Sequence, residues 1–275
     1  MTTTTTIKTI CPPEVYSALK NTYKQLKFIQ VNIANKIIPH YLDIRKEFNN
    51  YQAQDKNTVV PAKFNCLTQT PLCDIMKMQG SDKALYQGEG KHNYTTFYNE
   101  AFAPLSKKPI RFFELGLGTN NPDIKANMGS AGRPGASLRG WKKFFPLANI
   151  FGADIDSSIL FEEDRIKTFY CDQTDSSIIK RMWDQPELQE DFDVIIDDGL
   201  HEYFANIIFF QNSIHKLKVG GIYIIEDILR TELTNWEHTI ENYAKEYPNL
   251  RFTVLKIPNV FNTWDNNLIV VERIF

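Results

Sequence analysis

Short apolar runs alternate with amphipathic stretches along residues 110–275. The runs have the length and composition of buried strands, and they cover residues 110–114, 149–154, 166–171, 192–197, 221–226, 251–257 and 267–275. Between them, apolar positions recur at helical spacing over residues 137–145, 176–183, 201–217 and 235–247. This alternation predicts an α/β fold with a Rossmann-like, doubly wound, seven-stranded and mostly parallel sheet. Because no helix separates the last two runs, they are expected to form a C-terminal antiparallel hairpin.

The pattern is different in the N-terminal part of the chain. Apolar residues recur three or four positions apart over residues 13–38, which predicts a helix that Pro39 ends or kinks. A second helical stretch is expected to run on to Phe48. These helices are interpreted either as a docking arm, which could join copies of the chain into a homo-oligomer, or as helices that pack on their own domain.

The organisation of the chain follows from these two patterns. Residues 51–75 contain Pro61 and Pro71 and are interpreted as a linker or an irregular cover. We therefore expect an N-terminal helical extension and linker over residues 1–75. A single α/β domain is expected over residues 76–275.

Composition and charge narrow the class of protein. The 31 basic and 33 acidic residues give a net charge of −2, which argues against nucleic-acid binding as the main role. No apolar run is long enough to span a bilayer, and the first residues lack the pattern of a signal peptide. The four cysteines lack C-x-x-C spacing, as expected of a reduced, cytoplasmic protein. They are Cys11, Cys66, Cys73 and Cys171.

Two predicted strands end in pairs of carboxylates. Asp197 and Asp198 end one strand, and Glu226 and Asp227 end the next. His201 follows the first pair. The carboxyl ends of neighbouring parallel strands meet at one edge of a sheet, where open α/β sheets bind ligands. Four acids gathered there are costly unless a cation lies among them, so the sequence predicts an enzyme with a metal at its active site.

The first two predicted strands carry candidate cofactor-binding residues. The sequence "ELGLG" places Glu114, Gly116 and Gly118 at the end of the first strand. Asn121 stands where a dinucleotide fingerprint would have its third glycine, so the motif alone is weak. The second strand ends "GADID", and an acid there can accept hydrogen bonds from ribose hydroxyls. We expect Asp154 and Asp156 to play this role, and the alternative for Asp154 is a helix cap or a turn.

Further cofactor contacts are expected from the third strand and the first helix. Asp172 or Gln173 could bind an adenine edge, whereas Asp175 could equally cap the following helix. The glycine-rich segment 119–136 is long for a connection, and such loops are usually functional. Ser137 follows this loop and either contacts the cofactor or caps the helix. Asp197 completes the predicted cofactor-binding set.

The order of these motifs resembles class I S-adenosylmethionine-dependent methyltransferases. Within that class, residues 76–275 resemble the metal-dependent sugar O-methyltransferases of the macrocin and mycinamicin type. Part of the resemblance is the stretch "SLRGWKKFFPLANIFGADID", which begins at Ser137. Another part is an upstream segment similar to the family's G-T-D-K…H-x-Y stretch, through Ser81, Asp82, Lys83, His92 and Tyr94. The sequence departs from the family in the long loop 119–136 and at Leu200.

The resemblance implies an activity and roles for the acidic strand ends. It implies methyl transfer from S-adenosylmethionine to the hydroxyl of a sugar, in a nucleotide sugar or a glycan. Asp198, Glu226 and Asp227 would be ligands of a divalent ion, and His201 would be the general base. Carboxylate oxygens suit Mg²⁺ or Mn²⁺ better than zinc, and the ion would stabilise the developing alkoxide. His92 is a second candidate for the base or a contact to the substrate.

Two other functions remain open on the sequence alone. A nicotinamide-dependent oxidoreductase or epimerase could use a similar sheet, but the third glycine and a downstream Tyr-x-x-x-Lys pair are missing. A non-catalytic partner subunit could keep the fold and bind through its N-terminal helices. The complete set of acids with His201 favours an enzyme.

Overall fold

The computed structural model describes residues 68–84, 91–259 and 261–275. All of them belong to the compact unit that spans residues 57–275. The helices expected over residues 13–48, and with them the proposed docking arm, lie outside the described residues.

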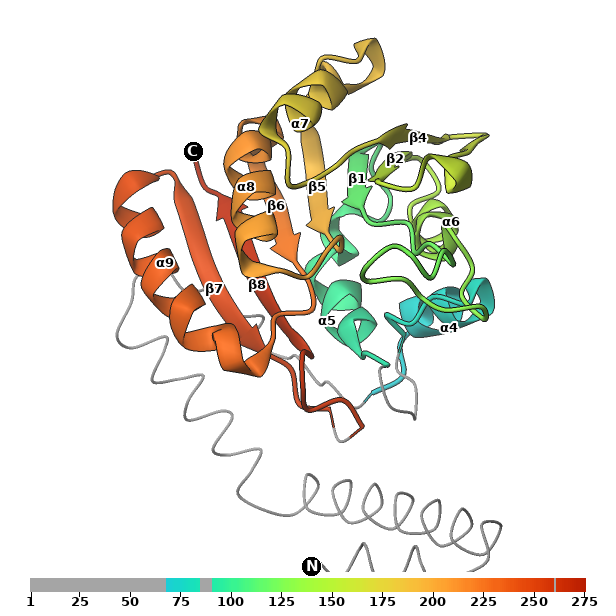
Figure 1. Cartoon of the computed structure of the whole chain (residues 1–275), viewed down its shortest axis with the longest axis horizontal. Helices are drawn as coiled ribbons and strands as arrows, with labels where there is room; N and C mark the ends of the chain where they lie inside the picture. The colour runs from blue at the N-terminus through green and yellow to red at the C-terminus, as the bar shows by residue number, and fades with distance from the viewer. Residues whose placement is uncertain (1–67, 85–90, 260) are drawn as a thin grey trace, which may run out of the picture. The chain divides into compact units, whose positions relative to one another are not determined.

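The domain is built on one mixed sheet with the strand order β3-β4-β2-β1-β5-β6-β8-β7 (Figure 1). Strands β4, β2, β1, β5 and β6 are parallel, and β8 runs antiparallel between β6 and β7. The strands are β1 Arg111–Leu115, β2 Asn149–Asp154, β3 Glu162–Glu163, β4 Ile166–Tyr170, β5 Phe192–Asp197, β6 Leu217–Ile225, β7 Leu250–Lys256 and β8 Asn267–Arg273. The predicted doubly wound sheet with its terminal antiparallel hairpin is confirmed. The two-residue β3 adds an edge strand to the seven predicted, since it pairs antiparallel with β4.

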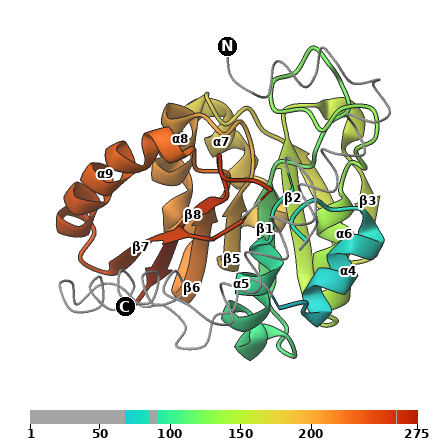
Figure 2. The same cartoon turned by 90° about the horizontal axis from the view of Figure 1, so that it is seen from below.

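Helices cover both faces of the sheet. Helices α7, α8 and α9 lie on one face, and α4, α5 and α6 lie on the other (Figures 1 and 2). Their bounds are α4 Pro71–Gln79, α5 Tyr94–Ala101, α6 Ala136–Phe144, α7 Ser176–Trp183, α8 Tyr203–Ser213 and α9 Leu233–Glu246. Short 3-10 turns occupy Ala103–Leu105, Ser157–Ile159, Pro186–Leu188, Ile214–Lys216 and Arg230–Glu232. In the part of the chain that is described, no helix is long and apolar enough to cross a membrane.

Local capping explains where several helices begin. Asp175 accepts hydrogen bonds from the backbone N–H groups of Ser177 and Ile178, and so it caps α7, the role expected for it. Pro71 was expected in a linker, but it occupies the first turn of α4, where a missing N–H costs nothing. The hydroxyl of Thr70 caps that helix. The predicted boundary between residues 75 and 76 therefore falls inside α4.

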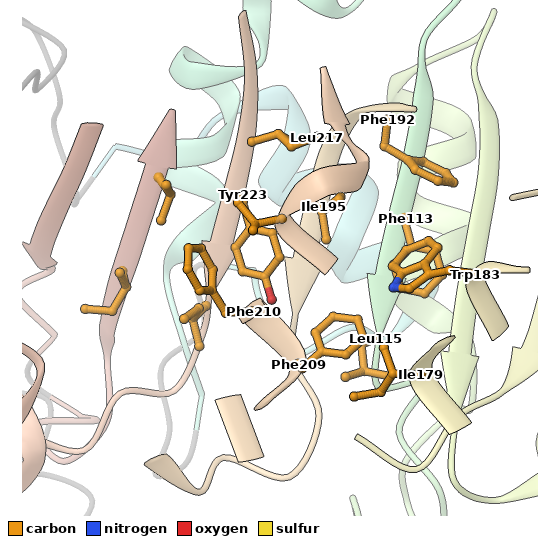
Figure 3. Close-up of a cluster of buried hydrophobic side chains, with 14 of the residues drawn as sticks. Phe113, Leu115, Ile179, Trp183, Phe192, Ile195, Phe209, Phe210, Leu217 and Tyr223 are labelled. Atoms are coloured by element: carbon orange, nitrogen blue, oxygen red, sulfur yellow. The ribbon is translucent and has the colours of Figure 1, made fainter. Parts of the chain in front are cut away.

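Alternating side chains of β1 connect the two helical layers. Phe113 points toward α7 and α8, and its ring centroid lies 4.6 Å from that of Trp183 (Figure 3). Phe112 points to the opposite face, where its centroid lies 4.9 Å from that of Trp141 on α6. All four of these aromatic side chains are buried. Because successive strand residues face opposite sides, an apolar strand of this kind requires helices on both faces.

Candidate active site

One cavity lies at the carboxyl ends of the parallel strands. Its volume is about 720 Å³, a size suited to a cofactor together with part of a substrate. It includes the crevice between β1 and β5, where the strand order reverses and open α/β sheets bind ligands. Most of the residues predicted for the site line this cavity, namely Gly116, Gly118, Ser137, Asp154, Asp172, Gln173, Asp198, His201, Glu226 and Asp227. Glu114, Asp156 and Asp197 are not among the residues that line it.

Backbone hydrogen bonds past the ends of the strands bring the two acid pairs together. The N–H of Asp198 donates to the carbonyl of Leu115 at 2.9 Å. The N–H of Glu226 donates to the carbonyl of Asp197, also at 2.9 Å. These bonds continue the parallel ladders of β1–β5 and β5–β6 by one residue. The sequence prediction that both acid pairs meet at one edge of the sheet therefore agrees with the structure.

The ammonium group of Lys83 lies among three of the carboxylates. Its Nζ is 2.7 Å from Oε2 of Glu226 and 3.3 Å from Oε1 of Glu114, and it donates a short hydrogen bond to Oδ2 of Asp198. Burial alone would lower the pKa of Lys83, but the carboxylates of Asp198, Glu226 and Glu114 raise it well above the usual value. The acidic strand ends predict a cation at this place, but they do not identify Lys83 as that cation. No spacing rule connects it to partners more than a hundred positions downstream.

Glu226 is held from two sides. Besides Lys83 at Oε2, the phenol of Tyr98 donates to Oε1 at 2.7 Å. Tyr98 belongs to α5, which the strand and helix pattern of the sequence did not reveal. The carboxylate is thus fixed at the base of the cavity, where it is almost completely buried.

The carboxylate of Asp227 lies next to two histidines and a tyrosine. Its Oδ1 accepts a hydrogen bond from Tyr94 at 2.8 Å and lies 3.5 Å from Nε2 of His92. Its Oδ2 lies 3.6 Å from Nε2 of His201. Burial would raise the pKa of Asp227, but His92, His201 and Lys83 lower it below the usual value. The side chain of Asp227 is therefore a carboxylate in a partly positive environment.

Asp227 and His201 also share an unusual backbone conformation. Their φ angles are +56° and +58°, in the left-handed region that few non-glycine residues adopt. Residues held in such conformations gather at functional sites. His201 was expected to begin a helix, but α8 begins at Tyr203, and His201 instead lies in the loop that precedes it. In this loop the imidazole faces Asp227.

Three of these side chains fit a divalent cation. Asp198, His201 and Asp227 each offer one ligand atom, and these atoms lie within 4.8 Å of one another. The Nδ1 atom of His201 is buried and has no hydrogen-bond partner among the described residues. The resemblance had implied Asp198, Glu226 and Asp227 as ligands, with His201 as the base. The structure groups His201 with the two aspartates, while Glu226 faces Lys83 and Tyr98.

Close packing requires glycine at two positions in the loop that follows β1. A Cβ on Gly116 would lie 1.9 Å from the backbone carbonyl oxygen of Asp198. A Cβ on Gly118 would meet the sulfur of Met128 at the same distance. Both residues have positive φ angles, +90° and +77°. Gly116 therefore lets the end of β1 approach the acidic loop after β5, and Gly118 admits the loop that covers the cavity.

The acids that follow β2 differ in their roles. Asp154 lines the cavity, and its oxygens accept hydrogen bonds from the N–H groups of Leu117 at 2.7 Å and Asp156 at 2.8 Å. Asp156 caps the next 3-10 turn through the N–H of Ser158 and accepts a short hydrogen bond from Thr119. Asp154 can therefore meet a ligand, whereas Asp156 holds the loop in shape.

The remaining predicted cofactor residues also form hydrogen bonds within the protein. They are Gln173, Asp197 and Asp172. Gln173 donates to Asp197 at 3.3 Å and accepts from the N–H of Leu200, so it ties the acidic loop to the cavity wall. Asp197 is buried and is also bound by Asn206 at 3.0 Å; burial raises its pKa to about 6. Asp172 turns back to the N–H of Thr174 at 2.9 Å.

Glu114 and Ser137 lie side by side. Glu114 is buried; its Oε2 accepts a hydrogen bond from the indole of Trp141, and its Oε1 forms an ion pair with Lys83. Ser137 was considered as a possible helix cap, but α6 begins at Ala136 after Gly135. Ser137 instead lies in the first turn of α6 and lines the cavity.

Comparison with known proteins identifies the fold. No family model matches the chain. A structure of MycE methyltransferase from the mycinamycin biosynthetic pathway, in complex with Mg, SAH and Mycinamycin VI, superposes with a TM-score of 0.55 at 23% identity. It covers 75% of this chain and 55% of that one. The domain thus has the fold of a class I S-adenosylmethionine-dependent methyltransferase.

Sequence similarity narrows the relationship. The chain is 35% identical over 138 residues to an 8-demethyl-8-(2-methoxy-alpha-L-rhamnosyl)-tetracenomycin-C 3'-O-methyltransferase from Streptomyces olivaceus. It is 32% identical over 138 residues to the mycinamicin VI 2''-O-methyltransferase of Micromonospora griseorubida. Each match covers 50% of this chain and 32% of the relative, so the chain spans about a third of the length of these relatives. The predicted resemblance to sugar O-methyltransferases of the macrocin and mycinamicin type is confirmed over the matched residues.

Proposed function

We propose that this protein transfers a methyl group from S-adenosylmethionine to a sugar hydroxyl, with the help of a bound Mg²⁺ or Mn²⁺ ion. The observation that carries the proposal is that two groups of residues line one cavity. Gly116, Gly118 and Asp154, from the ends of β1 and β2, line it together with Asp198 and Asp227 and the histidines that face Asp227. The names of the relatives, which act on rhamnosyl groups or on mycinamicin, support a sugar on a natural product as the acceptor.

The cofactor would occupy the end of the cavity formed by β1, β2 and β4. Gly116, Gly118 and Ser137 would line it, with Asp154 available to the ribose hydroxyls. Asp172 and Gln173 would stand beside the adenine. This assignment requires that Asp154 accept hydrogen bonds from the ligand in addition to those from the backbone, and a carboxylate has enough lone pairs for both.

The reacting hydroxyl would lie at the acidic end. Asp198 and Asp227 would hold the divalent ion, which stabilises an alkoxide when bound. His201 is the proposed base because its Nε2 faces Asp227 and its ring reaches the cavity. His92, on the other side of Asp227, is the second candidate, with a role in orienting that carboxylate or the substrate.

The proposal also covers the cellular location of the enzyme, its acceptor and its oligomeric state. Cys73 and Cys171 are buried free thiols, which supports a reducing, cytoplasmic location. A nucleotide sugar remains a second acceptor class. The oxidoreductase alternative loses support because the relatives above are methyltransferases. The role of the N-terminal helices in an oligomer stays a prediction.

Methyl transfer should depend on the divalent ion. We expect label from methyl-labelled S-adenosylmethionine to appear on a rhamnosylated polyketide acceptor in Mg²⁺, and the rate to fall at least about a hundredfold in EDTA. Added Mg²⁺ or Mn²⁺ should restore it. A nucleotide-activated rhamnose in a parallel assay distinguishes the two acceptor classes. An undiminished rate in EDTA would show that the acid cluster does not work through a metal.

A further inference from the structure

Lys83 is a fixed part of the acid cluster. Its side chain is only 2% exposed. Its backbone is held on both sides, since its carbonyl accepts from the N–H of Thr95 at 3.2 Å and its N–H donates to Oγ of Ser81 at 3.3 Å. Lys83 therefore does not reach in from the surface; it follows α4 closely in the chain and lines the wall of the cavity.

The contacts of this ammonium join three strands. Its three carboxylate partners are Glu114 at the end of β1, Asp198 after β5 and Glu226 after β6. These strands are neighbours in the sheet. Nζ of Lys83 donates hydrogen bonds to Asp198 and Glu226 and forms an ion pair with Glu114 at 3.3 Å. Lys83 thus fixes the relative positions of the three carboxylates.

The formal charges show why a cation is needed here. Glu114, Asp198, Glu226 and Asp227 carry four negative charges when ionised, and three of these side chains contact Lys83 directly. Buried like charges repel one another unless cations compensate them. A divalent ion can leave the site, whereas Lys83 cannot.

We propose that Lys83 is the resident counter-ion of the acid cluster, which positions Asp198 and Glu226 and keeps the site assembled when no divalent ion is bound. The proposal rests on the proposed function only in taking Asp198 and Asp227 as ligands of that ion. Lys83 acts through these carboxylates and is a positioning residue. If Lys83 has this role, the protein can release and rebind its divalent ion without losing the structure of the site.

The test is a Lys83→Met variant, whose melting temperature is measured in EDTA and in Mn²⁺. Without the ammonium, the carboxylates repel one another, and the melting temperature in EDTA should fall on the order of 10 °C. Mn²⁺ should recover at least half of this loss, because the ion then supplies the missing charge. In the wild-type protein the shift caused by Mn²⁺ should be smaller.

Lys216→Met is the matched control. Lys216 is also buried, but its Nζ donates to the carbonyl of Gln189 at 2.9 Å, and it does not line the cavity. This variant should melt at a lower temperature by an equal amount in EDTA and in Mn²⁺. If Lys83→Met does not fold, the double variant Lys83→Met/Glu226→Gln should fold, because it removes one of the uncompensated carboxylates.

The outcomes separate this proposal from the proposed function. A loss in Lys83→Met that is the same in EDTA and in Mn²⁺, as in the control, would overturn the counter-ion role. So would a failure of the wild-type protein to take up Mn²⁺, measured from the electron paramagnetic resonance signal of the free ion. Uptake of Mn²⁺ with ion-dependent rescue of Lys83→Met, but no methyl transfer, would support the counter-ion role and refute the proposed function.

Discussion

An Asp227→Asn variant is expected to lose metal-dependent methyl transfer by at least about a thousandfold, or about 4 kcal/mol of barrier. The carboxylate of Asp227 is the group that faces both His92 and His201. Asparagine has the same shape and tolerates the left-handed φ of +56°, so the variant should fold. What it lacks is the negative charge that would hold the ion. The rate of label transfer in saturating Mg²⁺ measures the loss.

Binding of the cofactor should survive in the same variant. The predicted cofactor residue Gly118 follows β1 and Asp154 ends β2, whereas the partners of the Asp227 side chain are Tyr94, His92 and His201. S-Adenosylmethionine should therefore bind within about threefold of the wild-type affinity, a difference below about 1 kcal/mol. Asp184→Asn is the control, because Asp184 is an exposed partner of Lys180. Normal turnover by Asp227→Asn in Mg²⁺ would remove Asp227 from the metal site.

A Gly116→Ala variant is expected to lose about 3 to 5 kcal/mol of unfolding free energy, from left-handed strain together with overpacking. The new methyl group would lie 1.9 Å from the carbonyl oxygen of Asp198, a backbone atom that cannot move without displacing the acidic loop. Cofactor binding should also fall, since the same loop forms the wall of the cavity. Chemical denaturation measures the first effect, and titration with S-adenosylmethionine measures the second.

A Gly220→Ala variant distinguishes the cost of the steric clash from the cost of the left-handed backbone conformation. Gly220 has a similar positive φ of +78°, but nothing lies within 4 Å of the position that its Cβ would take. This variant should lose only about 1 to 2 kcal/mol, the cost of the left-handed conformation. It should bind the cofactor normally, since Gly220 is remote from the cavity. Equal losses in the two variants would mean that the approach of Gly116 to Asp198 is not tight.

The elements with a strong local signal could be predicted from the sequence. Strands Asn149–Asp154 and Phe192–Asp197 have the predicted bounds because their apolar runs end in charged residues. Helix Ser176–Trp183 has them because Asp175 supplies a cap that the sequence displays. In each case a local physical rule fixes both the type of element and its end.

Where local signals conflict with packing, the prediction was less accurate. β6 was expected to begin at Gly221, but it begins at Leu217 and passes through two glycines. The pairing with β5 shifts its register there, so Gly220 sits at an irregularity in the strand and not at a turn before it. Helix α4 was missed because Pro71 signals a break inside a helix but is favoured in its first turn.

The sequence predicted which acidic residues meet at the site, but it did not predict that Lys83 lies among them. Asp198, Glu226 and Asp227 could be placed together because the ends of parallel strands share one edge of the sheet. Lys83 and Tyr98 could not be placed, since their contacts with Glu226 join positions 143 and 128 residues apart. Asp156 and Asp197 were predicted to bind the cofactor on the strength of their positions. In the structure their carboxylates accept hydrogen bonds from Thr119 and Asn206, and their contact with the cofactor stays a prediction.

Calorimetric titration with S-adenosylmethionine and with NAD tests the central claim most directly. S-Adenosylmethionine should bind with micromolar affinity, about −8 kcal/mol, and NAD should not bind. Binding should weaken in an Asp154→Ala variant, whose lost carboxylate lines the cofactor end of the cavity. Binding of NAD in place of S-adenosylmethionine would contradict the account and favour an oxidoreductase, and binding of neither would favour a non-catalytic subunit.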